Sequence, residues 1–352
     1  MNKILMKGNE AIAQAAINAG CRHYFGYPIT PQNEIGAYMS KHMIKAGGTF
    51  LQAESEIAAI NMVLGAAASG KRAMTSSSSP GISLKAEAIS YLAGCDLPCV
   101  IINVQRGGPG LGGIQPSQAD YFQATKALGH GDFNVIVLAP SSVQEMFNLT
   151  FKSFDLAEKY RTPVLILADG MLGQMMEPVV IDKKIAPENL TKQNWAASGH
   201  KNERKPNYIN SLIIDPELLE KTIMARYERY AKIQSECAEF EEFMCDDAEI
   251  VIVAYGASYR ISKVAAMKAR EKSIKVGIFR PVTLWPFPSN QLKNLNAKAF
   301  LTVEMSTGQM VEDVKSAVEF ARPVHFYGRT GGILVDEDEI FEKIVKVAEG
   351  TN

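Results

Sequence analysis

The alternation of helical and strand-like segments constrains the fold of this chain more than any other feature. From residue 8 to residue 176, segments with helical spacing of apolar residues alternate with short strand-like runs, for example NEAIAQAAINAG followed by RHYFGYPI. Strands that are joined through helices run parallel, because a parallel connection needs a crossover of about a dozen residues or more. The pattern therefore predicts an α/β fold in which a parallel sheet carries helices on both faces.

The same alternation appears a second time near the end of the chain. After a polar stretch, the charged segment DPELLEKTIMARYERYAKIQSECAEFEEFM has the spacing of one long helix, and a new strand-like run then begins with EIVIVAYG. We therefore predict three parts: an α/β domain over residues 1–185, a linker and long helix over 186–245, and a second α/β domain over 246–352.

Charge and composition exclude several classes of function. The net charge is -1, from 37 basic and 38 acidic residues, so there is no electrostatic footprint for nucleic acid or an anionic membrane. No apolar run reaches the length of a membrane span or has the form of a secretory signal, and we expect a cytoplasmic protein. The cysteines form no Cys-x-x-Cys pair and the histidines are scattered, so we expect no metal site in this chain.

A glutamate opens a helix that is otherwise apolar. In LQAESEIAAINMVLGAAASG, residues 51–70, Glu54 and Glu56 are followed by no further charged residue. Acidic residues in a first helical turn complement the helix dipole, which is one explanation. The other is a functional carboxylate, because a charge buried beside Ile57 and Ile60 needs a hydrogen-bonding partner. Both explanations stay open on residue type alone.

The spacing that follows Glu56 resembles a known cofactor module. Gly65 lies nine positions after Glu56, and the segment SGKRAMTSSSSPG comes next. This pattern resembles the pyrimidine-binding domain of thiamine-diphosphate enzymes. The resemblance implies that Glu56 bonds the aminopyrimidine and activates the cofactor, and that Ser78 and Ser79 line the cofactor site. A buried carboxyl group is suited to sharing a proton with a weakly basic ring nitrogen.

The segment FGYPITPQNE passes from a predicted strand into a predicted helix. Thr30 has the character of an N-cap and Pro31 that of a first helical residue, and a helix N-terminus can also bind a carboxylate. The motif YPITP is similar to that of alpha-type subunits of 2-oxoacid:ferredoxin oxidoreductases. This resemblance implies that Thr30 contacts the substrate carboxylate and that Tyr27 and Pro28 lie at the cofactor site.

Arg106 follows an apolar strand at its carboxyl end, where open α/β sheets bind their ligands. An ordinary surface arginine is the alternative. The motif QRGGP resembles the same family, which implies that Arg106 pairs with the 2-oxoacid carboxylate, a bidentate task for which lysine is a poor substitute. We expect Gly107 and Gly108 to let the backbone approach the cofactor or the substrate.

The glycine-rich loop also matches a nucleotide-binding pattern by chance. Gly108, Gly110 and Gly113 have Gly-x-Gly-x-x-Gly spacing, but Pro109 interrupts it and the match occurs late in the domain, which argues against nicotinamide binding. The next stretch, SQADYFQATKAL, is predicted to be a helix. The segment LGGIQPSQADYFQATK looks most like the subgroup that acts on branched-chain 2-oxoacids, with 2-oxoglutarate and pyruvate as alternatives.

The resemblance extends over roughly residues 5–345, with the second domain similar to the transketolase C-terminal type. It implies oxidative decarboxylation of a 2-oxoacid, such as 3-methyl-2-oxobutanoate, to acyl-coenzyme A and CO₂, with electrons passed to ferredoxin. The chain lacks the Gly-Asp-Gly…Asn segment that holds Mg²⁺ and the diphosphate. The resemblance therefore implies a hetero-oligomer, with a beta-type diphosphate-domain subunit, a gamma-type subunit and a ferredoxin-like iron–sulfur subunit.

Two other functions remain open at this point. One is a subunit of a thiamine enzyme that does not use ferredoxin, and the other is a catalytically silent scaffold subunit. The sequence also leaves open which 2-oxoacid is used, the subunit stoichiometry, the direction of flux, and whether the second domain contacts coenzyme A.

Overall fold

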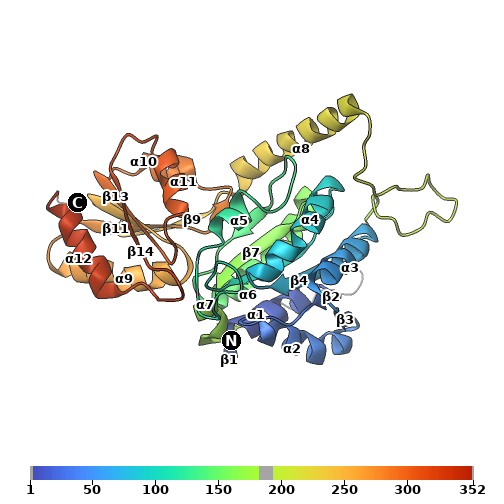
Figure 1. Ribbon diagram of the computed structural model, residues 1–352, viewed down its shortest axis with the longest axis horizontal. Helices are drawn as coiled ribbons and strands as arrows, with labels where there is room; N and C mark the ends of the chain where they lie inside the picture. The colour runs from blue at the N-terminus through green and yellow to red at the C-terminus, as the bar shows by residue number, and fades with distance from the viewer. Residues whose placement is uncertain (1–2, 182–192, 351–352) are drawn as a thin grey trace.

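The computed structural model describes residues 3–181 and 193–350. Two α/β units lie next to each other, and α8 (Pro216–Cys237) crosses the first unit on its way to the second (Figure 1). Within the described residues, the first unit has a seven-stranded sheet in the order β12-β6-β7-β5-β4-β2-β3. Its strands are β2 (His23–Gly26), β3 (Thr49–Gln52), β4 (Ala73–Ser77), β5 (Val100–Gln105), β6 (Ile136–Leu138), β7 (Val164–Asp169) and β12 (Thr283–Trp285).

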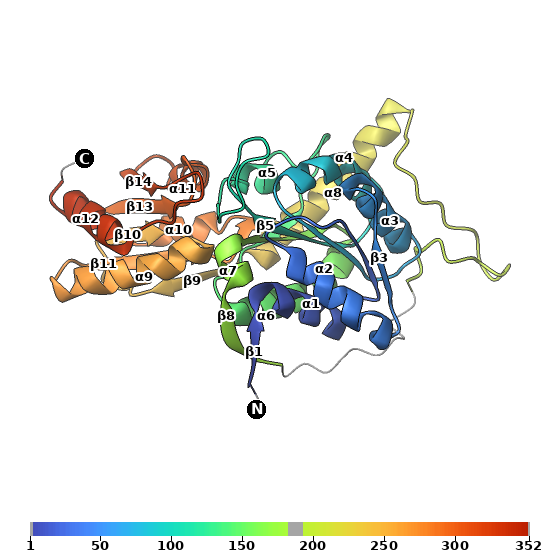
Figure 2. The same ribbon diagram turned by 60° about the horizontal axis from the view of Figure 1, so that its bottom comes forward.

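Helices cover both faces of this sheet, as the alternation predicted (Figure 2). One core joins the sheet to helices α3 and α4 and includes Ile60 and Ile89, and a second joins the opposite face to α1, α2 and α6 and includes Ile12 and Phe154. The helices of this unit are α1 (Gly8–Asn18), α2 (Asn33–His42), the 3₁₀ turn η1 (Ile44–Ala46), α3 (Glu56–Ala68), α4 (Pro80–Gly94), α5 (Tyr121–Thr125), α6 (Val143–Tyr160) and α7 (Gly170–Gln174).

The second unit repeats the α/β pattern on a smaller scale. Its described residues form a five-stranded sheet, β14-β13-β10-β11-β9, in which only β9 runs antiparallel to its neighbour. The fold class predicted from the sequence is therefore confirmed. The elements of this unit are β9 (Phe240–Phe243), β10 (Ile250–Val253), α9 (Gly256–Glu271), β11 (Val276–Pro281), α10 (Ser289–Asn294), β13 (Ala299–Glu304), α11 (Met310–Ala317), β14 (Val324–Gly328) and α12 (Glu337–Ala348).

The long helix is shorter than the sequence suggested. It ends at Cys237, and the residues that follow form β9, which pairs antiparallel with β11. The ring of Phe240 stacks on that of Phe279 with 5.3 Å between centroids. Aromatic stacking and a sheet ladder therefore prevail over helical propensity in the segment FEEF.

Two further pairings of strands were not predicted. β1 (Lys3–Lys7) and β8 (Met176–Val180) form a small antiparallel sheet. β12, which follows the second unit's β11, returns to pair antiparallel with β6 of the first unit. These strands are short and far apart in sequence, so their pairing depends on tertiary structure. None of the described helices combines the length and the apolar character needed to cross a bilayer.

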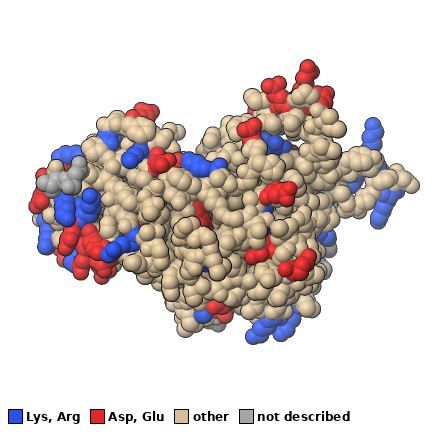
Figure 3. All heavy atoms as spheres, viewed as in Figure 1, with Lys and Arg blue, Asp and Glu red and all other residues tan. Residues whose placement is uncertain are grey.

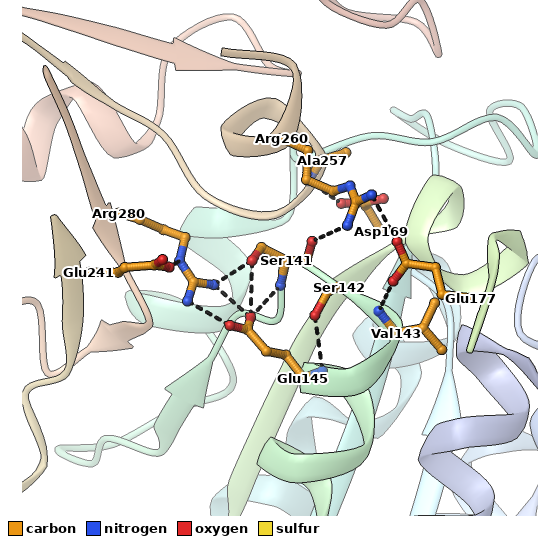
Figure 4. A network of polar contacts seen from close by, with 10 residues as sticks. All are labelled: Ser141, Ser142, Val143, Glu145, Asp169, Glu177, Glu241, Ala257, Arg260 and Arg280. Atoms are coloured by element: carbon orange, nitrogen blue, oxygen red, sulfur yellow. Dashed lines mark hydrogen bonds and ion pairs between the residues drawn. The ribbon is translucent and has the colours of Figure 1, made fainter. Parts of the chain in front are cut away.

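Polar side chains join the two units near the carboxyl ends of the first sheet (Figure 4). Arg280 of β11 donates to Glu145 of α6, with nitrogen–oxygen distances of 2.7 and 2.8 Å. Arg260 of α9 donates to Glu177 at 2.8 Å, and the amide of Ala257 donates to Asp169 at 3.0 Å. These contacts fix the second unit against the edge where the parallel strands end.

Gln118 makes a further set of contacts between the units. Its backbone N–H donates to Met305 O at 2.9 Å. Its side-chain amide donates to Tyr255 O at 2.8 Å and accepts from Ser258 Oγ at 2.6 Å. The predicted helix SQADYFQATKAL is therefore reduced to α5, because its first residues are held in an irregular conformation by the second unit.

Candidate functional site

Glu56 is the first residue of α3, and its side chain is buried with 6% of the residue exposed. Ser55 caps this helix, since its Oγ accepts from the amide of Ala58 at 3.1 Å. Among the described residues, no protein group donates a hydrogen bond to the Glu56 carboxylate. The oxygens of this carboxylate are not among the fully buried unpaired atoms, so they are open to a partner from outside the chain, and this geometry favours a ligand over a simple dipole role.

A glycine in the next helix makes room for the Glu56 carboxylate. A Cβ placed on Gly81, in the first turn of α4, would lie 2.7 Å from Glu56 Oε1 and 2.0 Å from Ser77 Oγ. The hydroxyls of Ser77 and Ser78 are buried, and neither has a hydrogen-bonding partner in the described structure. One carboxylate and two hydroxyls thus remain available at the carboxyl end of β4. This set fits an aminopyrimidine ring, which offers both donors and acceptors.

Lys85 lies beneath this group and was not identified from the sequence. Its Nζ is fully buried and donates to the backbone oxygen of Glu56 at 3.3 Å and to Thr75 Oγ1 at 3.1 Å. Burial lowers the pKa of Lys85 from 10.5 to about 8, although the nearby Glu56 charge opposes the shift. The only available signal was its position one helical turn after Gly81.

The structure brings Arg106 and Thr30 together. Arg106 is 7% exposed, and its Nη1 donates to Thr30 O at 2.9 Å while Nη2 donates to Leu111 O at 3.0 Å. Its Nε is buried without a partner in the described part of the chain. Arg106 is therefore not an ordinary surface arginine, and it retains donor capacity for an anion.

The prediction that Thr30 caps a helix is wrong. Helix α2 begins at Asn33 with Gln32 as its N-cap, and Thr30 lies within a turn closed by the bond from Gln32 N to Ile29 O at 3.1 Å. The carbonyl of Pro31 accepts instead from Asn9 Nδ2 at 2.8 Å and Gln174 Nε2 at 3.0 Å. These two amides, distant in sequence, stop the helix from starting earlier.

The remaining predicted residues lie in separate places. Tyr27 and Pro28 are exposed and line a hollow of about 310 Å³ beside α2, and Thr30 lines another of about 620 Å³ that reaches the second unit. Ser79 lies between Ser78 and the Arg106 backbone, and its Oγ accepts from Arg106 N at 3.1 Å. Its hydroxyl is thus already used within the protein.

The glycine loop after β5 folds back on itself. Gly107 N donates to Gln115 O at 3.0 Å, and Gly107 O accepts from Gly113 N at 2.9 Å. A Cβ on Gly107 would lie 3.5 Å from Gly331, whereas one on Gly108 would meet nothing within 4 Å. The next helix begins only at Tyr121, so this loop lacks the helix N-terminus on which dinucleotide binding depends.

Two further polar residues behind Arg106 were missed by sequence reasoning. Asp120 and Asn103 contact Ser79 and each other, and both lie in segments whose patterns looked merely helical or strand-like. Among the described residues there is no group of three or more His, Cys, Asp or Glu side chains that could hold a metal ion.

Comparison with known proteins identifies the family. Residues 14–244 match the model described as pyruvate flavodoxin/ferredoxin oxidoreductase, thiamine diP-bdg, and residues 248–340 match pyruvate:ferredoxin oxidoreductase core domain II. The chain belongs to the 2-oxoacid:ferredoxin oxidoreductase family, as an alpha-type subunit. Members of this family use thiamine diphosphate, which agrees with the group formed by Glu56, Ser77 and Ser78.

Individual relatives refine this placement. The chain is 49% identical to ketoisovalerate oxidoreductase subunit VorB of Methanothermobacter marburgensis, over 99% of both chains. It is 38% identical to 2-oxoglutarate synthase subunit KorA of Methanocaldococcus jannaschii, over 95% of this chain and 97% of that one. A solved 2-oxoglutarate:ferredoxin oxidoreductase from Magnetococcus marinus, with 2-oxoglutarate, coenzyme A and succinyl-CoA bound, superposes with a TM-score of 0.85 at 26% identity, covering 98% of this chain and 65% of that longer chain.

Proposed function

We propose that this chain supplies the pyrimidine-binding half of the active site in an enzyme that oxidatively decarboxylates a branched-chain 2-oxoacid to acyl-coenzyme A, with ferredoxin as electron acceptor. The observation that carries this proposal is the Glu56 carboxylate of a buried residue, which has no protein donor in the described structure and packs so close to Gly81 that a Cβ there would lie 2.7 Å from Oε1. When bound, thiamine diphosphate supplies a nucleophilic carbon that attacks the keto group.

Each of three residues has a separate role in this proposal. Glu56 shares a proton with the pyrimidine ring nitrogen and so holds the reactive tautomer of the cofactor. Arg106 and Thr30 orient the 2-oxoacid by its carboxylate, since the Arg106 guanidinium is already fixed beside Thr30 and keeps Nε unpaired. None of these steps requires a metal ligand from this chain.

The cofactor-facing surface is proposed to include residues on either side of Glu56. Ser78 provides a free hydroxyl, Tyr27 and Pro28 form an exposed rim, and Gly107 and Gly108 allow close approach of the backbone. Ser79 contributes less directly than the sequence suggested, because its hydroxyl bonds Arg106 and Asp120. We place Ser79 in the wall behind the site.

The diphosphate, Mg²⁺ and iron–sulfur clusters are proposed to reside on other subunits: a beta-type, a gamma-type and a ferredoxin-like chain. The face that carries α3, α4 and α5 supports such a partner, because it is largely free of charged side chains in Figure 3. Large apolar residues are exposed on and around it: Ile57, Leu84, Tyr91, Leu111 and Ile114. An apolar surface of this kind beside an incomplete site is typical of a subunit interface.

A branched-chain substrate such as 3-methyl-2-oxobutanoate is favoured over 2-oxoglutarate by the order of the similarities. The identity to the ketoisovalerate relative is 49%, against 38% for the 2-oxoglutarate relative of comparable coverage. The assay below compares this substrate with the two alternatives, 2-oxoglutarate and pyruvate.

The test is viologen or ferredoxin reduction by this chain co-expressed with its partner subunits, with thiamine diphosphate, Mg²⁺ and coenzyme A present. We expect coenzyme A-dependent reduction that is fastest with 3-methyl-2-oxobutanoate. A Glu56→Gln variant should assemble normally and lose activity, whereas Glu54→Gln, at an exposed carboxylate two residues earlier, should retain it.

Other outcomes would redirect the assignment. Turnover with lipoamide or artificial acceptors but not ferredoxin would indicate a thiamine enzyme of another type. No turnover with any 2-oxoacid, from a complex with intact clusters and bound cofactor, would support the scaffold function instead. Full activity of the Glu56→Gln variant would remove the proposed role of that residue.

A further inference from the structure

A group of buried and half-buried polar side chains lies directly behind Arg106. The Asp120 carboxylate oxygen Oδ2 accepts from Ser79 Oγ at 2.6 Å and from Asn103 Nδ2 at 2.9 Å. Ser79 Oγ in turn accepts from the Arg106 amide at 3.1 Å, and the Ser79 amide donates to Asn103 Oδ1 at 3.1 Å. These bonds join the end of β5, the start of α4 and the backbone of Arg106.

Ser79 needs such support because its backbone is strained. Its φ is 24° and its ψ is -83°, in a region that residues with a side chain rarely adopt. A conformation of this kind costs on the order of 1–3 kcal/mol and persists only where surrounding contacts hold it. Ser79 precedes α4, yet its side chain makes no capping bond to that helix. The hydroxyl is directed to Asp120 and Arg106 instead.

The charges of this group are arranged around Asp120. Desolvation raises the pKa of the Asp120 carboxyl, while the hydrogen bonds from Ser79 and Asn103 and the charge of Arg106 act in the opposite direction. The backbone of Asp120 is fixed as well, since its amide donates to Gln105 Oε1 at 3.1 Å. Hydrogen bonds therefore fix both the side chain and the backbone of Asp120.

Hydrogen bonds consequently fix both the side chain and the backbone of Arg106. Its guanidinium is held by the carbonyls of Thr30 and Leu111, and its amide is held by Ser79. If the amide contact is lost, the side chain must span a different distance to the same carbonyls. A displacement of about 1 Å at a substrate-orienting group can change rates by about a hundredfold.

We propose that Asp120 is a positioning residue, which acts through Ser79 Oγ to fix the backbone from which Arg106 reaches the 2-oxoacid carboxylate. Asp120 itself does not contact the substrate. This inference rests on the proposed function, because it assumes that Arg106 binds the 2-oxoacid.

The first experiment compares Asp120→Ala with Asp120→Asn in the assembled enzyme. Alanine removes the oxygen that accepts both bonds, whereas asparagine can keep an oxygen in that place. We expect Asp120→Ala to raise KM for the 2-oxoacid by about ten- to a hundredfold, with a smaller change in kcat and no change in thiamine diphosphate affinity. Asp120→Asn should stay within about threefold of wild type. An unchanged KM in the alanine variant, or equal loss in both variants, would overturn the proposal.

The second experiment measures the link to Arg106 without turnover. Hydrogen–deuterium exchange at the Arg106 amide should become faster in Asp120→Ala and in Ser79→Ala, which removes the same link from the other side. The matched control is Gln123→Ala, which removes a neighbour of the same group. Gln123 bonds Ser83 Oγ at 2.9 Å and lies 3.5 Å from Ser79 O and from Asn103 Nδ2, but within the described structure it makes no bond to Asp120 or to the Arg106 amide. Unchanged exchange in both test variants would overturn the proposal even if one of them folds poorly.

Failure of this inference can be told apart from failure of the proposed function. If the wild-type complex reduces ferredoxin and Arg106→Lys raises KM, the function stands, and the Asp120 variants then test positioning alone. If Arg106→Lys leaves KM unchanged, the role of Arg106 is wrong and the Asp120 proposal falls with it.

Discussion

Lys85 is a buried cation behind Glu56, and its surroundings make the stability of the protein depend on pH. Its pKa is lowered from 10.5 to about 8, chiefly by burial. The unfolded chain therefore binds one more proton than the folded chain between these two values, and stability rises with pH across that window. Burying the charged Lys85 lowers the free energy of unfolding at and below about pH 8, and this cost is absent above about pH 10.5.

Lys85→Met should remove this dependence, because methionine fills a similar volume without a charge. The difference in unfolding free energy between wild type and variant should change by about 3 kcal/mol from pH 8 to pH 10.5, at about 1.4 kcal/mol for each pKa unit. Urea unfolding of the chain at several pH values measures it. Parallel stability curves for the two proteins would contradict the assignment of a lowered pKa to Lys85.

Arg106→Lys tests the second predicted residue. Lysine keeps the charge but not the fork that holds two carbonyls and a carboxylate, so KM for the 2-oxoacid should rise by about tenfold or more while kcat changes less. Steady-state kinetics of the assembled enzyme measures both. Arg322→Lys is the matched control, since Arg322 also bonds carbonyls, Leu295 O at 2.6 Å and Lys293 O at 2.7 Å, but belongs to the second unit. A similar loss in both variants would point to general destabilisation.

Individual residues differed in how far the sequence could predict them. Glu56 and Arg106 were predicted because a charged residue at the edge of an apolar helix or strand is conspicuous and because both lie in motifs that resemble those of the family. Lys85 and Asp120 were missed, since a charge inside a helical pattern looks like part of a solvated face. The N-cap assigned to Thr30 was wrong because Asn9 and Gln174, remote in sequence, hold the Pro31 carbonyl.

At the scale of elements, the close approach of α4 to α3 is the feature on which the site depends. Gly81 allows that approach, since a Cβ there would lie 2.0 Å from Ser77 Oγ and 2.7 Å from Glu56 Oε1. The sequence placed both helices correctly, but it could not show that their first turns meet. Likewise, it extended the long helix through residues 240–243, because the pairing of β9 with β11 is a tertiary contact.

Gly81→Ala should therefore displace Glu56 or Ser77. We expect thiamine diphosphate affinity of the assembled complex to fall by at least about tenfold and the chain to lose about 1–3 kcal/mol of stability. Calorimetric titration and thermal unfolding measure the two effects. Gly65→Ala is the control on α3, where a Cβ meets nothing within 4 Å, and it should stabilise the helix by about 0.5–1 kcal/mol. Normal cofactor affinity in Gly81→Ala would show that cofactor binding does not depend on the close approach of α4 to α3 at this position.

At the scale of the whole molecule, the two α/β units are connected more closely than a linker implies. β12 leaves the second unit to complete the first sheet, and α8 contacts the first unit through the ion pair of Arg226 with Asp96 at 3.2 Å. Periodicity could predict two sheets, but it carries no information about a strand exchanged between them. The connection also brings Gly331 and Gly332 against the glycine loop beside Arg106. The second unit thus supports the site from outside the first sheet.

Gln118 makes this connection testable, because its buried side chain bonds Tyr255 O, Ser258 Oγ and Met305 N across the two units. Gln118→Leu would leave Ser258 Oγ and Met305 N buried without partners, at about 1–3 kcal/mol for each, whereas Tyr255 O would keep its bond from Tyr259 N at 3.2 Å. We expect the wild-type chain to unfold in one calorimetric transition. In the variant this transition should move to lower temperature and should broaden or divide, as the units uncouple. Gln234→Leu, the same substitution at an exposed position of α8, should leave the transition unchanged. A transition as sharp as that of wild type in Gln118→Leu would mean that β12 and the ion pairs couple the two units without Gln118. The Gln118 contacts would then not be needed to hold the second unit beside Arg106.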